Sequence, residues 1–142
     1  MELKFERPSR KYEAVIIMHP DATEQQQKDF FKKNSEILKS FKGDYSQVDS
    51  WGKRRLANPI GKLRMGHFFH AFFEAHSESI AELERTMRIN DQVLRFNHMR
   101  LDDRVSIAQH LEDYREVLVG SSKREQEREA KAQARKMART RN

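Results

Sequence analysis

Residues 11–18, Lys-Tyr-Glu-Ala-Val-Ile-Ile-Met, decide how this chain of 142 residues folds. The segment is rich in β-branched and aromatic residues, which predicts a β-strand. Successive side chains of a strand point to opposite faces, so the segment contributes to both faces of a sheet. One face receives Ala14, Ile16 and Met18, and the other receives Glu13, Val15 and Ile17.

The residues after this strand predict a helix. His19-Pro20-Asp21 ends the strand, and Asp21 with Glu24 three residues later is typical of a helix start. Gly43 is a plausible residue at which the helix stops. Between these points, four apolar side chains recur at helical spacing and form one stripe. These are Phe30, Ile37, Leu38 and Phe41.

Three further strands and a second helix follow from the hydrophobic periodicity. A second strand, 45–56, is interrupted near Gly52, where we expect a bulge. Asn58-Pro59 and residues 61–66 predict a polar, basic loop before a third strand over 67–75. Ser77 or Ser79 begins a second helix that turns Ile80, Leu83 and Met87 inward, and a fourth strand covers 93–101.

The order β-α-β-β-α-β predicts an α+β fold of the ferredoxin-like type. In this fold a four-stranded antiparallel sheet carries both helices on one face. The other face is left without a covering layer, and its expected residues are too apolar to lie comfortably in water. By strand alternation this open face holds Val15, Ile17, Phe68, His70, Phe72, Arg95, Asn97 and Met99. His98 falls on the inward face, unless a bulge places Met99 there instead.

Residues 51–60, Trp-Gly-Lys-Arg-Arg-Leu-Ala-Asn-Pro-Ile, contain the strongest candidate for a binding site. The cations of this segment and of the following loop suit contact with the phosphates of a nucleic acid, which positions a protein without reading sequence. The alternative is an edge strand that charge protects against edge-to-edge pairing. The candidate phosphate-contacting residues are Lys53, Arg54, Arg55, Lys62 and Arg64.

Charge is distributed unevenly along the chain, whose formal net charge is +6. Residues 121–142 hold eight Lys or Arg and three Asp or Glu, a net charge of +5, which leaves +1 for the rest. We expect a ferredoxin-like domain over 9–102, a short amphipathic extension over 103–120, and a basic tail over 121–142. The tail has nothing apolar to bury, so we expect it to be disordered alone or helical only against a partner.

The chain contains no cysteine, which excludes disulfides and thiolate metal sites. Residues 1–7 lack the apolar stretch of a signal peptide, and no apolar run is long enough to span a membrane. A soluble cytoplasmic protein is the simplest interpretation. His67, His70 and His76 do not suit a metal site, because His67 and His70 point to opposite faces of a strand and His76 lies about 20 Å from His70.

Several segments, taken in order over about residues 10–101, closely resemble the family of the sixth protein of the bacterial small ribosomal subunit. Within the longest match, Arg54-Arg55-Leu56-Ala57 is fairly specific, although the family usually has Tyr where Asn58 stands. The long basic tail takes little support from the resemblance. The matching segments are Arg10-Lys11-Tyr12-Glu13, His19-Pro20, the run from Trp51 to Lys62, Gly66-His67-Phe68, and the run from Arg88 to Arg95.

This resemblance implies a ribosomal structural protein with no catalytic activity and no cofactor. It further implies binding to small-subunit ribosomal RNA as a heterodimer with the eighteenth protein of that subunit. A protein partner on Val15, Ile17, Phe68, His70, Phe72 and Met99 is then the first interpretation of the open face. A covering helix from residues 106–119 comes second, and stacking of unpaired bases comes third.

Two alternatives to a ribosomal protein remain at this point. One is a free-standing ferredoxin-like regulator that binds RNA. The other is a non-catalytic ligand-binding domain of the same fold, which would leave the run from Lys53 to Arg55 unexplained. An enzyme is not expected, because the chain contains no phosphate-cradling Gly-rich loop after the first strand and no apparent Ser/His/Asp arrangement.

Overall fold

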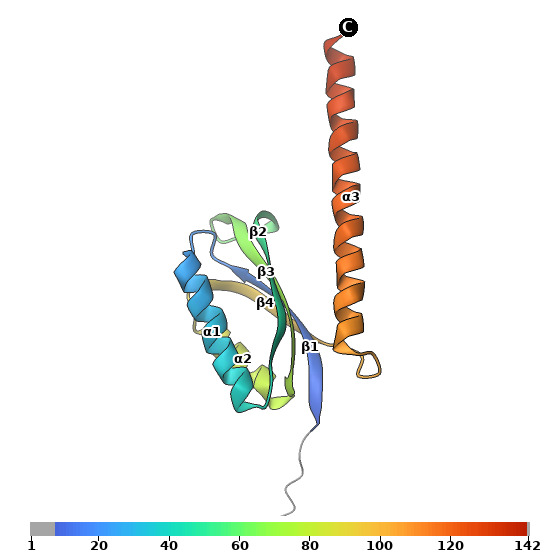
Figure 1. Cartoon of the computed structure of the whole chain (residues 1–142). Coiled ribbons are helices and arrows are strands. Elements are labelled where there is room, and N and C mark those ends of the chain that lie inside the picture. The colour runs from blue at the N-terminus through green and yellow to red at the C-terminus, as the bar shows by residue number, and fades with distance from the viewer. Residues whose placement is uncertain (1–7, 142) are drawn as a thin grey trace, which may run out of the picture. The chain divides into compact units, whose positions relative to one another are not determined.

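The computed structural model describes residues 8–141, which form four strands and three helices (Figure 1). Residues 1–7, on which the expectation about a signal peptide rests, lie outside the described residues, as does Asn142 at the end of the predicted tail. The elements are β1 (Ser9–Met18), α1 (Glu24–Ser40), β2 (Asp44–Ile60), β3 (Leu63–His76), α2 (Glu78–Arg88), β4 (Val93–Arg100) and α3 (Ile107–Thr140).

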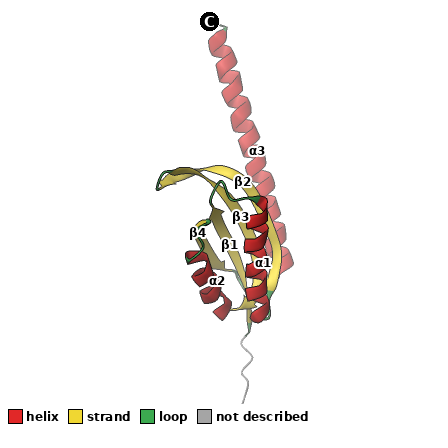
Figure 2. Cartoon of the chain, turned by 90° about the vertical axis from the view of Figure 1, so that its left-hand side faces the viewer, coloured by secondary structure: helices red, strands yellow, loops and turns green. Residues whose placement is uncertain are grey.

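The four strands form one antiparallel sheet in the order β2-β3-β1-β4. Both α1 and α2 lie on the same face of this sheet, as the two views in Figure 1 and Figure 2 show. The predicted ferredoxin-like α+β arrangement is therefore confirmed. It leaves β2 and β4 as the two edge strands, and β1 in the centre between β3 and β4.

The hydrophobic core lies between the sheet and the two helices. Alternate residues of β1 and β3 point into it, because strand side chains alternate between the two faces. Leu38 of α1 and Leu83 of α2 are fully buried against them. The strand residues of this core include Ala14, Ile16, Met18, Phe69, Ala71 and Phe73. Val15, Ile17, Phe68, His70 and Phe72 consequently belong to the opposite face, as the alternation predicts.

The N-terminal cap of helix α1 lies two residues beyond the predicted start at Asp21. Its N-cap is Thr23, whose hydroxyl accepts from the Gln26 amide at 3.2 Å while the Gln26 side chain accepts from the Thr23 amide at 2.9 Å. This capping box satisfies two backbone donors that the helix leaves open. Asp21 lies outside it, and its amide donates to His19 Nδ1 at 3.1 Å.

The end of α1 is a Schellman motif in which the left-handed residue is Lys42. The amide of Gly43 donates to Leu38 O at 2.9 Å, and the amide of Lys42 donates to Lys39 O at 3.1 Å. Lys42 has φ 56°, the conformation that glycine usually supplies at this position. Gly43 follows it and is required for another reason: a Cβ there would lie 2.5 Å from the Cβ of Ala75.

The predicted loop over 61–66 is instead the turn of a β-hairpin. β2 continues to Ile60, β3 begins at Leu63, and Ile60 pairs with Leu63 around the two-residue turn Gly61-Lys62. Gly61 has φ 58°, which suits the first central position of a tight hairpin turn. The polar and basic composition reflects an exposed hairpin rather than an irregular loop. Pro59 is tolerated because residues 56–59 have no ladder partners on β3.

Bulges set the faces of two edge strands. In β2 the register shifts between Ser50 and Gly52, as predicted, and Gly52 has φ 76°. In β4 the register shifts opposite Ile17 and Met18, before the strand places His98 on the helix face. The structure thus decides between the two expectations for this strand: His98 is inward, and Met99 is on the open face with 42% of its surface exposed.

The chain divides into two compact units, which meet between Asp103 and Arg104. The second unit contains α3, a continuous helix of 34 residues with no buried residue. Its bounds span most of the amphipathic extension expected over 103–120 and most of the basic tail expected over 121–142. Ser106 caps the helix by accepting from the Gln109 amide at 3.2 Å, and the Ala-, Glu-, Lys- and Arg-rich sequence has high helix propensity throughout. That residues 121–142 are disordered in the free protein, or helical only against a partner, stays a prediction.

Candidate nucleic-acid and partner surfaces

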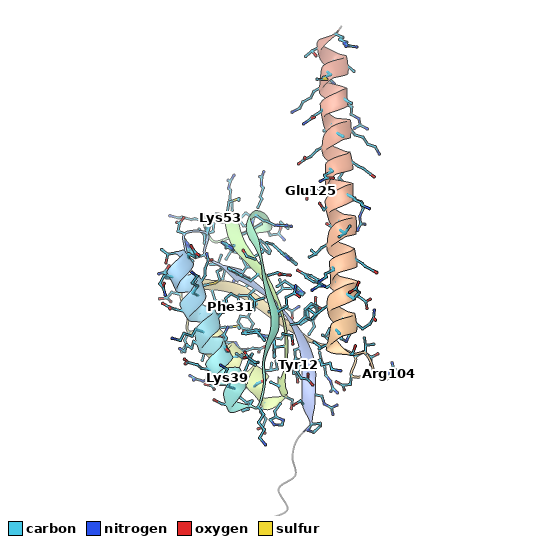
Figure 3. All side chains as sticks on the ribbon, in the orientation of Figure 1. Tyr12, Phe31, Lys39, Lys53, Arg104 and Glu125 are labelled. Carbon is cyan, nitrogen blue, oxygen red and sulfur yellow. The ribbon has the colours of Figure 1, made fainter. Side chains whose placement is uncertain are left out.

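Five cations gather on the hairpin that β2 and β3 form, and we call them the hairpin cations. They lie on the last part of β2, on the turn and at the start of β3, and all five are exposed. The structure therefore brings together every residue that the sequence assigned to RNA. They are Lys53, Arg54, Arg55, Lys62 and Arg64. Figure 3 labels Lys53 near this end of the sheet.

The hairpin cations point to both faces of the sheet. Lys53 pairs with His67 and Arg55 with Met65, on the helix face, while Arg54 pairs with Gly66 on the open face. Directly paired residues of antiparallel strands project to the same side, so the positive charge wraps around the edge strand. Such an arrangement can contact phosphates on either side of the hairpin.

The hairpin cations have no acidic residue to neutralise them. Residues 50–73 contain no Asp or Glu, and none of the five forms an ion pair with any other residue of the described range 8–141. Elsewhere in the domain, cations pair readily, as Arg85 does with Glu82 at 2.6 Å. The hairpin therefore carries uncompensated positive charge, which attracts polyanions.

The open face is assembled from three strands, as the sequence predicts. In the strand register Val15 lies opposite His70 and Asn97, and Ile17 lies opposite Phe68 and Arg95. All six residues assigned to a protein partner are on this face. Their exposure differs: Val15, Ile17 and Phe68 are half-buried, His70 and Phe72 are 2% and 3% exposed, and Met99 is 42% exposed.

Two further residues contribute to the open face: Glu13, which strand alternation places there without a role, and Trp51, which the sequence does not place. The indole of Trp51 stacks on the His70 ring, with centroids 5.6 Å apart and planes within 12°. His70 Nε2 lies 2.5 Å from Glu13 Oε1, and the His70 ring also meets Phe72 edge-on at 4.8 Å. Strand alternation places Glu13 on the same face as Val15, but its contact with His70 leaves no pattern in the sequence. Alternation does not place Trp51, because the bulge beside it breaks the pattern.

Trp51 also joins the open face to the hairpin cations. The Arg54 guanidinium lies over its ring, 5.5 Å from the centroid, and Arg54 Nε donates to Trp51 O at 3.2 Å. Cation–π contacts of this kind hold an arginine without neutralising it. The two surfaces therefore meet at one pair of side chains.

The histidines do not form a metal site. His67 and His70 project from opposite faces of β3, and no three His, Asp or Glu side chains converge suitably for a metal ion anywhere in residues 8–141. Burial and the neighbouring Lys53 ammonium lower the pKa of His67, which favours its neutral form. Within the same range, no helix is long and apolar enough to cross a lipid bilayer.

Comparison with known proteins gives one family. Residues 11–100 match the family described as ribosomal protein S6. The small ribosomal subunit protein bS6 of Bdellovibrio bacteriovorus is 55% identical over 82% of this chain and 76% of its own length. The bS6 protein of Geotalea uraniireducens is 37% identical over 70% of this chain and 77% of its length.

A solved structure shows the same fold. The crystal structure of the 30S ribosomal protein S6 of Thermotoga maritima superposes with a TM-score of 0.60 and 24% identity, covering 66% of this chain and 89% of that one. The family match covers the sheet, both core helices and the whole β2–β3 hairpin. The chain therefore belongs to the ribosomal protein S6 family of the small ribosomal subunit.

Proposed function

We propose that this chain binds small-subunit ribosomal RNA through the hairpin cations, while the eighteenth protein of that subunit binds its open face. The observation that carries the proposal is the set of five exposed cations on one hairpin, none paired with an acid in residues 8–141. Family membership makes the chain a non-enzymatic structural protein of the small subunit, so these surfaces serve assembly rather than catalysis.

The hairpin supports the RNA part of the proposal because it is both charged and stiff. Lys53, Arg54 and Arg55 lie on a strand whose backbone is held by β3, so their positions do not depend on a loop. Arg54 is further oriented by the Trp51 ring. A backbone fixed in this way loses little further conformational entropy when its side chains meet phosphates. An edge strand that charge merely protects needs no such orientation.

The open face supports the protein part of the proposal. Its centre is apolar and aromatic, and its rim carries polar residues such as Arg95 and Asn97. An apolar core with a polar rim is the usual composition of a protein interface. Met99 is the most exposed apolar side chain assigned to it and is well placed to be covered by a partner.

Helix α3 adds a third, electrostatic contribution. Residues 121–142 carry a net charge of +5, and all those described are exposed. We expect this segment to lie against ribosomal RNA in the assembled subunit, where phosphates offset the entropy of fixing the chain.

A footprint of the purified chain on small-subunit ribosomal RNA tests the proposal. Hydroxyl-radical cleavage is compared for RNA alone, RNA with this chain, RNA with the eighteenth protein, and RNA with both. The proposal predicts protections that need both proteins. Protection of the same nucleotides by this chain alone would instead favour the free-standing regulator, which would also fail to sediment with small subunits at high salt.

A further inference from the structure

A hollow between α1 and β2 belongs to none of the surfaces above. Its volume is about 490 Å³, within the range of small-ligand sites. It opens on the helix face of the sheet, and Figure 3 shows the Phe31 side chain between α1 and the strands. The residues that line it are Glu24, Gln27, Lys28, Phe31, Val48, Ser50 and Phe69.

Aromatic rings form the inner wall of this hollow. Phe31 meets Phe69 edge-on with centroids 5.0 Å apart, and the His67 ring stacks on Phe69 at 4.5 Å with planes within 9°. Val48, 39% exposed, lies at the rim on edge strand β2. Phe69 is only 4% exposed, so the apolar surface that solvent reaches in the hollow belongs to Phe31, which is half-buried, and to Val48.

A donor and an acceptor face the hollow beside these rings. Gln27 Nε2 lies 3.1 Å from Ala22 O and 3.3 Å from His67 Nδ1, and His67 Nε2 lies 2.7 Å from Ser50 Oγ. A neutral His67 protonated at Nε2 satisfies all three contacts. The Ser50 hydroxyl hydrogen and the Gln27 carbonyl oxygen are then available to a ligand, as a donor and an acceptor.

Positive charge lies at the hairpin end of the hollow. Lys53 pairs in register with His67 and has no ion-pair partner in residues 8–141. At the helix rim Lys28 is neutralised by Glu24 at 3.2 Å. Of these two lysines, only Lys53 therefore offers uncompensated positive charge to a ligand in the hollow, and it lies where the hairpin cations begin.

We infer that the hollow receives one unstacked nucleobase of single-stranded RNA, with an adjoining phosphate on Lys53. The half-buried ring of Phe31 offers an aromatic surface to a base, and the neighbouring donor and acceptor groups match a base edge. An aliphatic side chain from a protein would leave Gln27 and Ser50 unpaired on burial. The inference rests on the proposed binding of RNA and adds a base contact to the phosphate contacts.

The test compares two probes with identical backbones. The full chain, labelled with ¹⁵N and bound to the unlabelled eighteenth protein, is titrated with pentaadenylate and with an abasic RNA pentamer. Pentaadenylate should shift the amide signals of Val48, Ser50 and Phe69 as well as Lys53, whereas the abasic pentamer should shift only the hairpin. Equal shifts from both probes, or shifts confined to the hairpin, would overturn the inference.

Matched variants locate the base contact. Val48→Glu places a charge at the rim of the hollow, and Ile89→Glu makes the same change at a residue that is 67% exposed and outside it. Val48→Glu should weaken binding of pentaadenylate at least tenfold relative to Ile89→Glu, with equal binding of the abasic pentamer. If Val48→Glu lowers the thermal unfolding midpoint, Val48→Gln replaces it as the test variant.

The outcomes separate the two proposals. One outcome is that Val48→Glu and Ile89→Glu bind pentaadenylate equally while replacement of Lys53, Arg54 and Arg55 weakens binding of both probes. That result would refute the base contact in the hollow and support RNA binding by the hairpin cations. If the triple replacement changes neither probe, the proposed function itself fails. If Val48→Glu impairs only heterodimer formation, the hollow takes a protein segment and the base contact is refuted.

Discussion

Trp51 stacks on His70, and through this one contact the β2 bulge ties the aromatic open face to the cationic hairpin. The extra residue at the bulge turns the indole onto the face that β3 supplies with Phe68, His70 and Phe72. Arg54, whose guanidinium lies over the same indole, begins the charged surface. A partner that covers the open face would therefore also affect how the hairpin meets RNA.

The open face can be tested at Met99. Met99→Asp should weaken heterodimer formation with the eighteenth protein at least tenfold, about 1.4 kcal/mol, because it puts a charge into an apolar interface. Calorimetric titration measures the affinity. Met99 is exposed on an edge strand, so the thermal midpoint of the lone chain should change little. Ile89→Asp, which alters an exposed apolar residue at the end of α2, is the control. Equal affinities for the two variants would exclude Met99 from the interface.

Two adjacent substitutions at the end of α1 should change the free energy of unfolding in opposite directions. Lys42→Gly should stabilise the domain by about 0.5–1 kcal/mol, because φ 56° strains any residue with a Cβ. The adjacent Gly43→Ala should destabilise it by about 1–3 kcal/mol, because the new methyl group meets Ala75 of β3. Urea denaturation measures both. The account of this turn is wrong if the two substitutions shift the free energy of unfolding in the same direction.

His98 should make stability depend on pH. Its side chain is 2% exposed, and burial lowers its pKa below the ordinary value near 6.5, against the opposing effect of Glu84 at 3.3 Å. As the pH falls, His98 therefore binds a proton in the unfolded chain before it does so in the folded chain. The stabilisation is fully present above about pH 6.5 and is lost as the pH falls towards the folded pKa, by at most about 1.4 kcal/mol per pH unit.

His98→Leu should therefore flatten the fall in free energy of unfolding between pH 7 and 5, measured by urea denaturation at a series of pH values. Glu84 keeps a partner in this variant, because Arg88 Nη2 lies 3.3 Å from its other oxygen. A residual slope from His67 remains, because the pKa of that histidine is also lowered. Superimposable pH profiles for the two proteins would show that His98 does not titrate on unfolding.

The basic half of α3 should contribute to RNA binding and not to domain stability. Truncation after Gly120 removes only exposed residues from the described structure, so the thermal unfolding midpoint should stay unchanged. Affinity for ribosomal RNA should fall, most visibly at raised salt. Hydrogen exchange on the free chain tests directly whether the basic half of α3 is ordered. Strong protection of amides beyond Ser122 would contradict the prediction that this segment is mobile without RNA.

Most of the fold could be predicted because its signals are local. The alternation along residues 11–18 and 67–75 identified the two central strands and assigned their faces correctly. Gly52 marked the bulge of β2 because glycine permits a positive φ. The sequence predicts a loop where the hairpin turn lies, because Asn58, Pro59 and two glycines resemble a loop in composition. Only the pairing of Ile60 with Leu63 distinguishes the two.

The sites were harder to predict because they depend on distant contacts. The hairpin cations are close in sequence, so their proximity could be predicted. The stack of Trp51 on His70 joins two strands across a bulge, and the hollow joins α1 to β2. Neither leaves a periodic pattern. Lys42 shows a similar limit, because its left-handed conformation belongs to the Schellman motif that ends α1 and not to the preference of lysine itself.

The central claim, that the hairpin cations contact ribosomal RNA, is tested most directly by the salt dependence of RNA affinity. The complex of this chain with the eighteenth protein is measured with and without replacement of Lys53, Arg54 and Arg55 by Ala, over a range of salt concentrations. The account predicts weaker binding, a log–log salt slope that is flatter by about two to three units, and an unchanged thermal midpoint. An unchanged slope would contradict the central claim and would leave protection of an edge strand against pairing as the role of these cations.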